Sequence, residues 1–189
     1  MDHNKWIGNY YVSSNGEMLV NTIIGDYIIN NSGKATYSKD AALFNQPIEQ
    51  FKNYQLQLAE SKKYVYFQDI NNDGQNELIL GIKYYSEGPI GLVGIYMVNQ
   101  SGIIQEIKSF YDQDINGTAR NSIRMFRNGY VFYQNGMRYR EGHLRRIMNK
   151  TLITIYDGDY DSARQNEDDY FVLKDLSEIF VNVTDWIAL

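Results

Sequence analysis

The stretch that decides the fold runs from residue 64 to residue 81 and reads YVYFQDINNDGQNELILG. A run of aromatic and β-branched residues opens it, an apolar run closes it, and a polar segment rich in Asn, Asp and Gly lies between them. Aromatic and β-branched residues favour strands, whereas Asn, Asp and Gly favour tight turns. The stretch is therefore predicted to form two neighbouring strands joined by a polar loop.

The polar loop has the residue spacing of a calcium site. Oxygen-bearing side chains occupy its first, third, fifth and ninth positions, and glycine occupies the sixth. Ca²⁺ takes ~6–8 oxygen ligands, and a tight turn at glycine lets alternate residues converge on one point. We therefore expect a bound Ca²⁺ held by four side chains and one backbone carbonyl, that of Gln75, so that the ligands are Asp69, Asn71, Asp73, Gln75 and Glu77.

The loop is not an EF-hand, but a metal-free turn is an open alternative. An EF-hand needs Glu at position twelve and a helix on each side, whereas this loop has Leu80 there and strand-like flanks. Asn and Asp also form turns without metal, because their side chains bond their own backbone. Asp69 and Glu77 lie outside what such a turn requires, and this favours the metal. We expect a structural role, because no nucleophile or general base is evident beside the loop.

A family resemblance appears in the same residues. The segment 69–78, read as D-x-N-x-D-G-x-x-E-L, resembles the strand-loop-strand calcium loops of the FG-GAP and VCBS type. Residues 64–81 are similar to the signature YALYDINGDGIPELIIG of exported or lipid-anchored proteins of Gram-positive bacteria. Glu77 stands where FG-GAP loops usually carry Asp. The resemblance implies a bound ion and an extracellular setting, and it implies no particular reaction.

Short β-rich runs separated by turn residues dominate the rest of the chain. Asn128-Gly129 and Asn135-Gly136 are strong hairpin signals, because both central residues of a type I′ turn need positive φ. They predict a three-stranded meander over residues 123–141. No internal repeat is evident in this reading. The predicted strands are 6–12, 17–21, 26–30, 64–68, 77–85, 92–98, 103–111, 123–127, 130–134, 138–141 and 152–156.

Two segments have helical character. Residues 47–60 begin with Pro47, which suits the first helical position, and they carry apolar residues at helical spacing. A shorter helix is predicted over 174–181, followed by a docking tail over 186–189. The predicted fold class is α+β and mainly antiparallel β: a twisted sheet of hairpins with one or two packed helices and a strand-loop-strand calcium loop.

Composition limits the class of protein. The chain has 189 residues, 43% hydrophobic and 22% charged, which suits one globular domain over 1–189, with an N-terminal β-hairpin subdomain over 1–45 as the alternative. It has no Cys and only two His, so a disulfide framework or a multi-histidine metal centre is not expected. No stretch approaches the ~20 apolar residues of a membrane-spanning helix. The many aromatic residues, including Trp6 and Tyr10, are expected in sheets and core.

Basic residues gather in one part of an acidic chain, whose net charge is −5. This charge opposes a nucleic-acid role. The basic segment could face an anionic polymer or an acidic partner, since arginine suits forked contacts with phosphate and carboxylate. Internal pairing with the acidic residues that follow, from Asp157 onward, is the favoured alternative. The arginines concerned are Arg120, Arg124, Arg127, Arg138, Arg140, Arg145 and Arg146.

Glu141 and His143 are the only acid and histidine that sit together near basic and tyrosyl residues. A general acid/base pair could be drawn from them, and this makes a hydrolase of a cell-surface polymer the alternative function. No second carboxylate is positioned by spacing, so the sequence favours a protein that is not an enzyme.

Residues 2–5 form neither a basic nor an apolar leader segment, so a secretory signal is not expected within this chain. Either the protein is cytoplasmic or a signal or lipid-anchor segment is absent from this chain. The resemblance favours the second case. The first hypothesis is therefore an extracellular, calcium-stabilised, β-rich binding or accessory module of the cell surface. A cytoplasmic interaction protein with an ordinary turn is the third.

Overall fold

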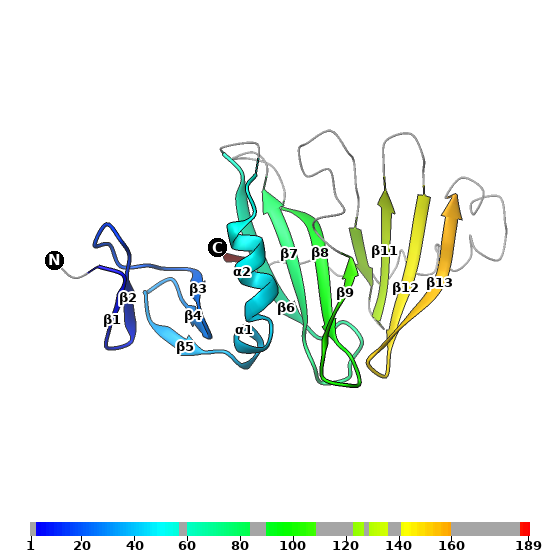
Figure 1. Ribbon diagram of the computed structural model, residues 1–189, viewed down its shortest axis with the longest axis horizontal. Helices are drawn as coiled ribbons and strands as arrows, with labels where there is room; N and C mark the ends of the chain where they lie inside the picture. The colour runs from blue at the N-terminus through cyan, green and yellow to red at the C-terminus, as the bar shows by residue number, and fades with distance from the viewer. Residues whose placement is uncertain are drawn as a thin grey trace.

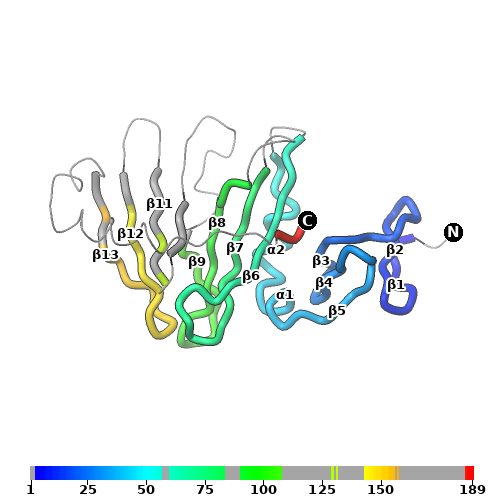
Figure 2. The backbone as a smooth tube through the Cα atoms, turned by 180° about the vertical axis from the view of Figure 1, so that it is seen from behind, coloured from blue at the N-terminus to red at the C-terminus, as the bar shows by residue number. Residues whose placement is uncertain are grey.

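The computed structural model describes residues 3–56, 60–83, 90–108, 123–126, 129–135, 141–159 and 186–189. Its elements follow one another along the long axis of the molecule (Figure 1). The N-terminal hairpins lie at one end, the strands β11 to β13 lie at the other, and the helices lie between them beside β6. Seen from behind, the C-terminal residues lie beside α2, between the N-terminal hairpins and the main sheets (Figure 2).

Antiparallel strands make up most of the described chain, and they form four sheets. Two small sheets contain β1 (Lys5–Ile7) and β2 (Tyr10–Val12), and β3 (Thr22–Ile24), β4 (Tyr27–Ile29) and β5 (Ala35–Tyr37). The central sheet has the order β14 (Ile187–Ala188), β6 (Lys62–Gln68), β7 (Glu77–Lys83), β8 (Gly91–Val98) and β9 (Ile104–Lys108). The fourth sheet has the order β10 (Ile123–Phe126), β11 (Tyr130–Asn135), β12 (Glu141–Met148) and β13 (Thr151–Asp159). The predicted class, α+β and mainly antiparallel β, is confirmed.

The N-terminal strands differ from the prediction. The single strand expected over 6–12 is a hairpin, because Gly8 takes a φ of 60° and reverses the chain between β1 and β2. The strand expected over 17–21 is reduced to one isolated bridge between Val12 and Met18. The strands β3 and β5 were not predicted, whereas β4 lies within the predicted strand 26–30.

The N-terminal residues contain an internal repeat of 17 residues that the sequence reading missed. Gly8, Asn9, Tyr10 and Gly16 correspond to Gly25, Asp26, Tyr27 and Gly33. Backbone hydrogen bonds repeat at the same offset: Gly16 N–H donates to Ser13 O and Gly33 N–H to Asn30 O, both at 3.0 Å. Asn4 and Asn21, also 17 residues apart, both have a φ of 49°. Residues 3–34 are therefore two copies of one hairpin unit.

The helices cover one face of the central sheet. The short helix α1 (Lys39–Leu43) begins at Ser38, whose hydroxyl accepts the Ala41 N–H at 3.1 Å. It was not predicted from the sequence. The helix α2 (Asn45–Asn53) follows at once and corresponds to the helix predicted over 47–60.

The helix α2 ends at Asn53, seven residues earlier than predicted, where Lys63 of β6 binds carbonyl groups of its last turn and C-cap. Tyr54 is extended, with φ −66° and ψ 126°. The ammonium of Lys63, on β6, donates to the carbonyl of Lys52 at 2.5 Å and to that of Tyr54, and so satisfies acceptors that a helix end leaves open. Burial lowers the pKa of Lys63. The helix predicted over 174–181 lies outside the described residues.

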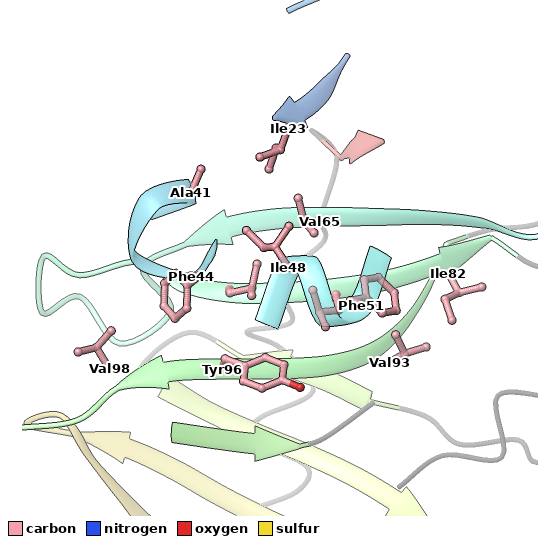
Figure 3. Close-up of a cluster of buried hydrophobic side chains, with 12 residues drawn as sticks. Ile23, Ala41, Phe44, Ile48, Phe51, Val65, Ile82, Val93, Tyr96 and Val98 are labelled. Carbon is pink, nitrogen blue, oxygen red and sulfur yellow. The ribbon is translucent and has the colours of Figure 1, made fainter. Parts of the chain in front are cut away.

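The first hydrophobic core lies between the helices and the central sheet (Figure 3). Phe44, Ile48 and Phe51 come from the helical segment, and all are at most 1% exposed. They pack with the face of the sheet that carries Leu78, Leu80 and Ile82 of β7, Val65 of β6, and Val93, Tyr96 and Val98 of β8. Ile23 of β3 joins the same cluster, which attaches the N-terminal hairpins to the sheet.

The second core lies on the opposite face of the central sheet. It contains Ile79 of β7 together with Ile95 and Met97 of β8, because successive strand residues point to opposite faces. The fourth sheet contributes Val131 and Ile147. The central sheet is therefore buried on both faces, and this explains the continuous apolar runs of β7 and β8.

The C-terminal tail docks as predicted and adds a short strand. β14 pairs antiparallel with β6, with Ile187 opposite Val65. The ring of Trp186 lies over Tyr64 and Tyr66, with centroid distances of 6.4 and 6.2 Å. Gly81 leaves room for this ring: an added Cβ would lie 2.7 Å from Trp186 Cη2 and 2.6 Å from Ile90 Cγ2.

Gly81→Ala is therefore expected to destabilise the protein by ~1–3 kcal/mol, since overpacking forces neighbours out of their rotamers. Denaturant unfolding measures the change. In a Trp186→Ala background the same substitution should cost less, because one of the two clashing groups is gone. An equal cost in both backgrounds would show that the ring does not rest on Gly81.

The meander predicted over 123–141 is confirmed where the structure describes it. β10, β11 and β12 pair antiparallel in sequence order, and β13 adds a fourth strand. Of the strand predicted over 138–141, Glu141 lies in β12, which runs to Met148. Residues 136–140 lie outside the described part. No helix within the described residues has both the length and the apolar character needed to cross a membrane.

Candidate functional site

The five residues predicted to bind Ca²⁺ lie at the junction of β6 and β7. Gln68 pairs with Glu77 as the last pair of the ladder, so the loop starts at Asp69 and closes at Glu77. Asn72 and Gly74 take positive φ values, 59° and 83°, and turn the chain sharply. Strand, loop and strand follow one another as the sequence predicts.

Backbone amides hold the loop carboxylates in place. Asp69 Oδ1 accepts the Asp73 N–H at 3.1 Å, and Asp69 Oδ2 accepts the Gly74 N–H at 2.8 Å. Asn71 Oδ1 also accepts the Asp73 N–H, at 3.0 Å, and Asp73 Oδ1 accepts the Gln75 N–H at 2.8 Å. A carboxylate has about four lone-pair sites, so each of these groups keeps acceptor capacity.

Glu77 is the buried member of the loop. It is 2% exposed, and its Oε2 accepts the Ile70 N–H at 2.9 Å. Burial raises the pKa of the Glu77 carboxyl from 4.5 to about 8; the bond from Ile70 opposes this rise, and the charges of Asp73 and Asp69 add to it. A cation in this loop would offset the repulsion between the Glu77 carboxylate and the charges of Asp69 and Asp73.

The donor set fits a hard cation by its chemistry, since every donor of the five is an oxygen and three residues carry a carboxylate. Within the described part of the chain, no group of three or more His, Cys, Asp or Glu side chains converges closely enough to hold a metal ion by itself. An ion here would therefore need the Asn71 oxygen, the Gln75 carbonyl or water as well as carboxylates. The calcium assignment stays a prediction.

The loop also contacts the helical side of the molecule. The Asn76 side chain donates to Asp40 Oδ2 at 2.7 Å, and Asp40 lies in the first turn of α1. Asn76 and Asp40 are both partly buried. The loop is thus tied to the helical segment as well as to its own strands.

A second feature with chemical potential is an exposed aromatic cluster on the N-terminal hairpins. Trp6 of β1 contacts Tyr11 of β2 and Tyr27 of β4, with both centroid distances at 5.2 Å. Tyr27 contacts Tyr37 of β5 at 6.0 Å, in an edge-to-face arrangement. Trp6, Tyr27 and Tyr37 are 39%, 41% and 59% exposed.

Trp6 and Tyr10 lie in strands, as predicted, but the expectation that they belong to the core is wrong. Both are exposed: β1 and β2 form a two-stranded sheet, and among the described residues neither ring joins a core cluster. The 17-residue repeat indicates the paired hairpins, but it does not identify the cluster, since Tyr10, the residue equivalent to Tyr27, lies outside it. Rings on different hairpins meet only through tertiary packing.

His143 has a carboxylate partner, and that partner is Asp157. The two residues are opposite each other on β12 and β13, with Nδ1 and Oδ1 2.6 Å apart. The Arg145 guanidinium donates to the same oxygen at 2.6 Å. Partial burial acts to raise the pKa of Asp157, but the bonds from Arg145 and His143 outweigh it and hold the pKa below its usual range. For Glu141 the structure describes only the backbone, in β12.

Internal pairing is thus realised for Arg145, as the favoured interpretation of the arginines predicted. The bulge between Leu144 and Arg145 lets residues 143 and 145 both reach Asp157. The backbone of Arg124 lies in β10, and Arg146 lies in β12. The remaining members of the set lie outside the described residues: Arg120, Arg127, Arg138 and Arg140.

Comparison with known proteins identifies one similar region. A family model described as "Choline-binding repeat" matches residues 1–34. This range contains β1 to β4 and both copies of the 17-residue unit. No curated protein and no solved structure matched the chain. The similarity therefore concerns the N-terminal hairpins and does not extend to the central and fourth sheets.

Proposed function

We propose that this chain is a binding module of a bacterial cell surface, that its N-terminal hairpins hold quaternary ammonium groups of a surface polymer, and that Ca²⁺ in the β6–β7 loop stabilises the sheet behind them. Choline is the ligand that the name of the matching repeat suggests. A setting outside the cell follows from such a ligand.

The observation that carries the proposal is the exposed ring cluster of Trp6, Tyr27 and Tyr37. Aromatic faces attract a quaternary ammonium through the ring quadrupole, worth ~0.5–1 kcal/mol at an exposed ring and ~2 kcal/mol where water is excluded. The rings are inclined to one another, at 60° for Trp6 with Tyr27 and 79° for Tyr27 with Tyr37. Inclined rings can present several faces to one cation.

The range of the matching repeat contains most of the ring cluster, and this supports the proposed ligand site. Trp6, Tyr11 and Tyr27 lie inside the matched range of 1–34, and Tyr37 lies just beyond it, on the strand paired with β4. The cluster joins two hairpins, so a ligand there would contact more than one copy of the repeated unit.

Removal of single rings tests the proposal. Trp6→Ala and Tyr27→Ala should each weaken choline binding by ~2–5-fold, the equivalent of one exposed cation–π contact. Isothermal titration calorimetry with choline measures the affinity, and retention on a quaternary ammonium matrix gives a second readout. Tyr10→Ala is the matched control, since Tyr10 is 43% exposed but lies outside the ring cluster. Equal losses in all three variants, or no binding by the wild type, would contradict the proposal.

The calcium part of the proposal is supported by the oxygen donors of residues 69–77 and by the backbone bonds that pre-orient them. The ion would hold the loop rigid between its strands and would take no part in a reaction. An anionic polymer at the basic segment is a further part of the proposal. Of that segment, Arg145 is already paired with Asp157.

A hydrolase that acts on a surface polymer is the second candidate. The observation that favours it is the 2.6 Å contact between His143 and Asp157, since a carboxylate at Nδ1 orients an imidazole for proton transfer at Nε2. Incubation of purified chain with cell-wall polymer, with His143→Gln as the comparison, tests it. Product release by the wild type and a large loss in the variant would support hydrolysis; equal traces with both proteins would eliminate it.

A further inference from the structure

The β6–β7 loop is also the place where the central sheet meets the fourth sheet. Ile70, inside the loop, is 2% exposed and belongs to the core cluster that contains Val131 of β11 and Ile147 of β12. The backbone of Ile70 makes two hydrogen bonds, one within the loop and one to the segment before β11. Its N–H donates to the Glu77 carboxylate at 2.9 Å, and its carbonyl accepts the Gly129 N–H at 2.7 Å.

Gly129 fits this joint closely. It is buried, precedes β11 and takes a φ of 78°. An added Cβ would lie 2.8 Å from the Cβ of Asn71, a predicted metal ligand, and 2.5 Å from the carbonyl oxygen of Ile147. One backbone position therefore touches the loop on one side and β12 on the other.

We propose that a divalent cation in the β6–β7 loop locks the β10–β13 sheet onto the central sheet through Ile70 and Gly129, so that the cation controls the docking of one sheet on the other. The inference rests on the proposed function, because it requires the loop to bind Ca²⁺. The ion would link Asp69, Asp73 and Glu77 across the loop, in addition to the backbone N–H groups from which each of them accepts a bond. Loosening of this loop would displace Ile70 and Asn71, the two loop residues next to Gly129.

Besides the shared core, a hydrogen bond away from the loop also joins the two sheets. The Gln100 side chain, in the turn between β8 and β9, donates to the carbonyl of Asn149, in the turn between β12 and β13, at 2.9 Å. This bond lies outside the loop and involves no predicted metal ligand. Loss of the ion is therefore expected to loosen the fourth sheet at the Ile70 joint rather than to detach it.

Docking and metal affinity are coupled in both directions. If the ion favours the docked sheet by a given factor, a docked sheet favours the ion by the same factor, and such couplings typically span ~5–150-fold. A variant that weakens docking without touching a ligand must therefore lower the affinity for Ca²⁺. This reciprocity separates a working joint from two features that only lie close together.

The experiment uses the full chain with Ca²⁺ or with a chelator. Hydrogen exchange measures the protection of amides in 130–134 and 143–147, and calorimetry measures Ca²⁺ affinity. In the wild type, saturating Ca²⁺ should slow exchange of these amides at least ~5-fold, the lower end of typical couplings. Gly129→Ala should lose this effect and bind Ca²⁺ at least ~5-fold more weakly, but because its added Cβ also meets Asn71, the reciprocity is tested by Val131→Ala, which touches no predicted ligand. Gly25→Ala is the matched control, because Gly25 has a φ of 56° and open space around an added Cβ, and it lies in the β3–β4 turn, away from the joint.

Val131→Ala keeps the test informative if Gly129→Ala does not fold. It removes apolar contact from the far side of the joint and should also lower Ca²⁺ affinity. Val93→Ala, equally buried but in the first core, should leave the affinity within ~2-fold. If Ca²⁺ binds but neither amide protection nor the variants' affinity changes, the inference is overturned and the calcium site stands. If the wild type binds no Ca²⁺, both the calcium site and the inference are wrong.

Discussion

Saturating Ca²⁺ is expected to raise the melting temperature of this protein by roughly 5–11 °C over the value with chelator, and Asp69→Asn or Asp73→Asn should remove most of the increase. An ion that binds only the folded state adds ~2.7 kcal/mol at a hundredfold its dissociation constant. For a chain of 150–250 residues, each kcal/mol moves the melting temperature by ~2–4 °C. Differential scanning calorimetry measures the shift directly.

The two Asn variants remove charge and keep a similar shape. An amide oxygen can still accept a backbone N–H, so Asp73→Asn can retain the bond from Gln75. The metal-free variants should therefore melt close to the metal-free wild type, or above it, because one repelling charge is gone. Glu17→Gln is the control, since it removes a negative charge from the N-terminal hairpins. Identical melting of the wild type with and without Ca²⁺ would eliminate the metal site.

The central part of the fold could be predicted from sequence because local signals and tertiary structure agree there. Apolar or aromatic runs flank residues 69–77 and form the paired strands β6 and β7, of which β7 is buried on both faces. The polar segment between the two strands forms the loop that joins them. The Asn-Gly signal at residue 129 likewise gave the β10–β11 hairpin. In both strand pairs the turn residues fix the register of pairing, and the register decides which side chains point to each face of the sheet.

The N-terminal part was predicted less well because its turns lie inside apolar runs. Gly8 and Gly25 reverse the chain with positive φ where the pattern suggests continuous strand or loop. The end of α2 depended on Lys63, which is ten residues downstream of the helix and reaches it only after β6 has paired. Long-range side chains of this kind leave no local signal.

The candidate sites divide in the same way. The five residues of the calcium loop lie within nine positions of sequence, so spacing alone predicts that they come together. The partner of His143 was not found, because Asp157 reaches it through the pairing of β12 with β13 and a bulge beside it. The ring cluster depends on packing of one hairpin on another, and exposure of Trp6 follows from the absence of a covering layer in the described structure.

The second large effect concerns Glu77 and the pH dependence of stability in the metal-free protein. The unfolded chain ionises this carboxyl near 4.5, whereas in the folded chain burial raises its pKa to about 8. Between these values the folded state holds a proton that the unfolded state has lost, so the free energy of unfolding falls as pH rises. The slope reaches ~1.4 kcal/mol per pH unit. Below 4.5 both states are protonated, and above 8 the destabilisation is complete.

Glu77→Gln should remove this slope. Its side chain stays neutral at every pH, and its amide oxygen can still accept the Ile70 N–H. With chelator present, the variant should match the wild type near pH 4.5 and exceed it increasingly toward pH 8, as measured by denaturant unfolding at several pH values. Glu17→Gln should follow the wild type throughout. Parallel curves for wild type and Glu77→Gln would show that the Glu77 carboxyl ionises as it does in water.

Ca²⁺ should reverse the comparison. A bound cation stabilises the ionised carboxylate, so metal binding releases the Glu77 proton and the affinity for Ca²⁺ should rise between pH 6 and 8. Glu77→Gln has no proton to release, and its weaker affinity should vary little over this range. Glu77 then destabilises the metal-free protein at neutral pH and also makes its stability depend on the ion. The reason is that the same buried carboxylate is costly when alone and favourable beside a cation.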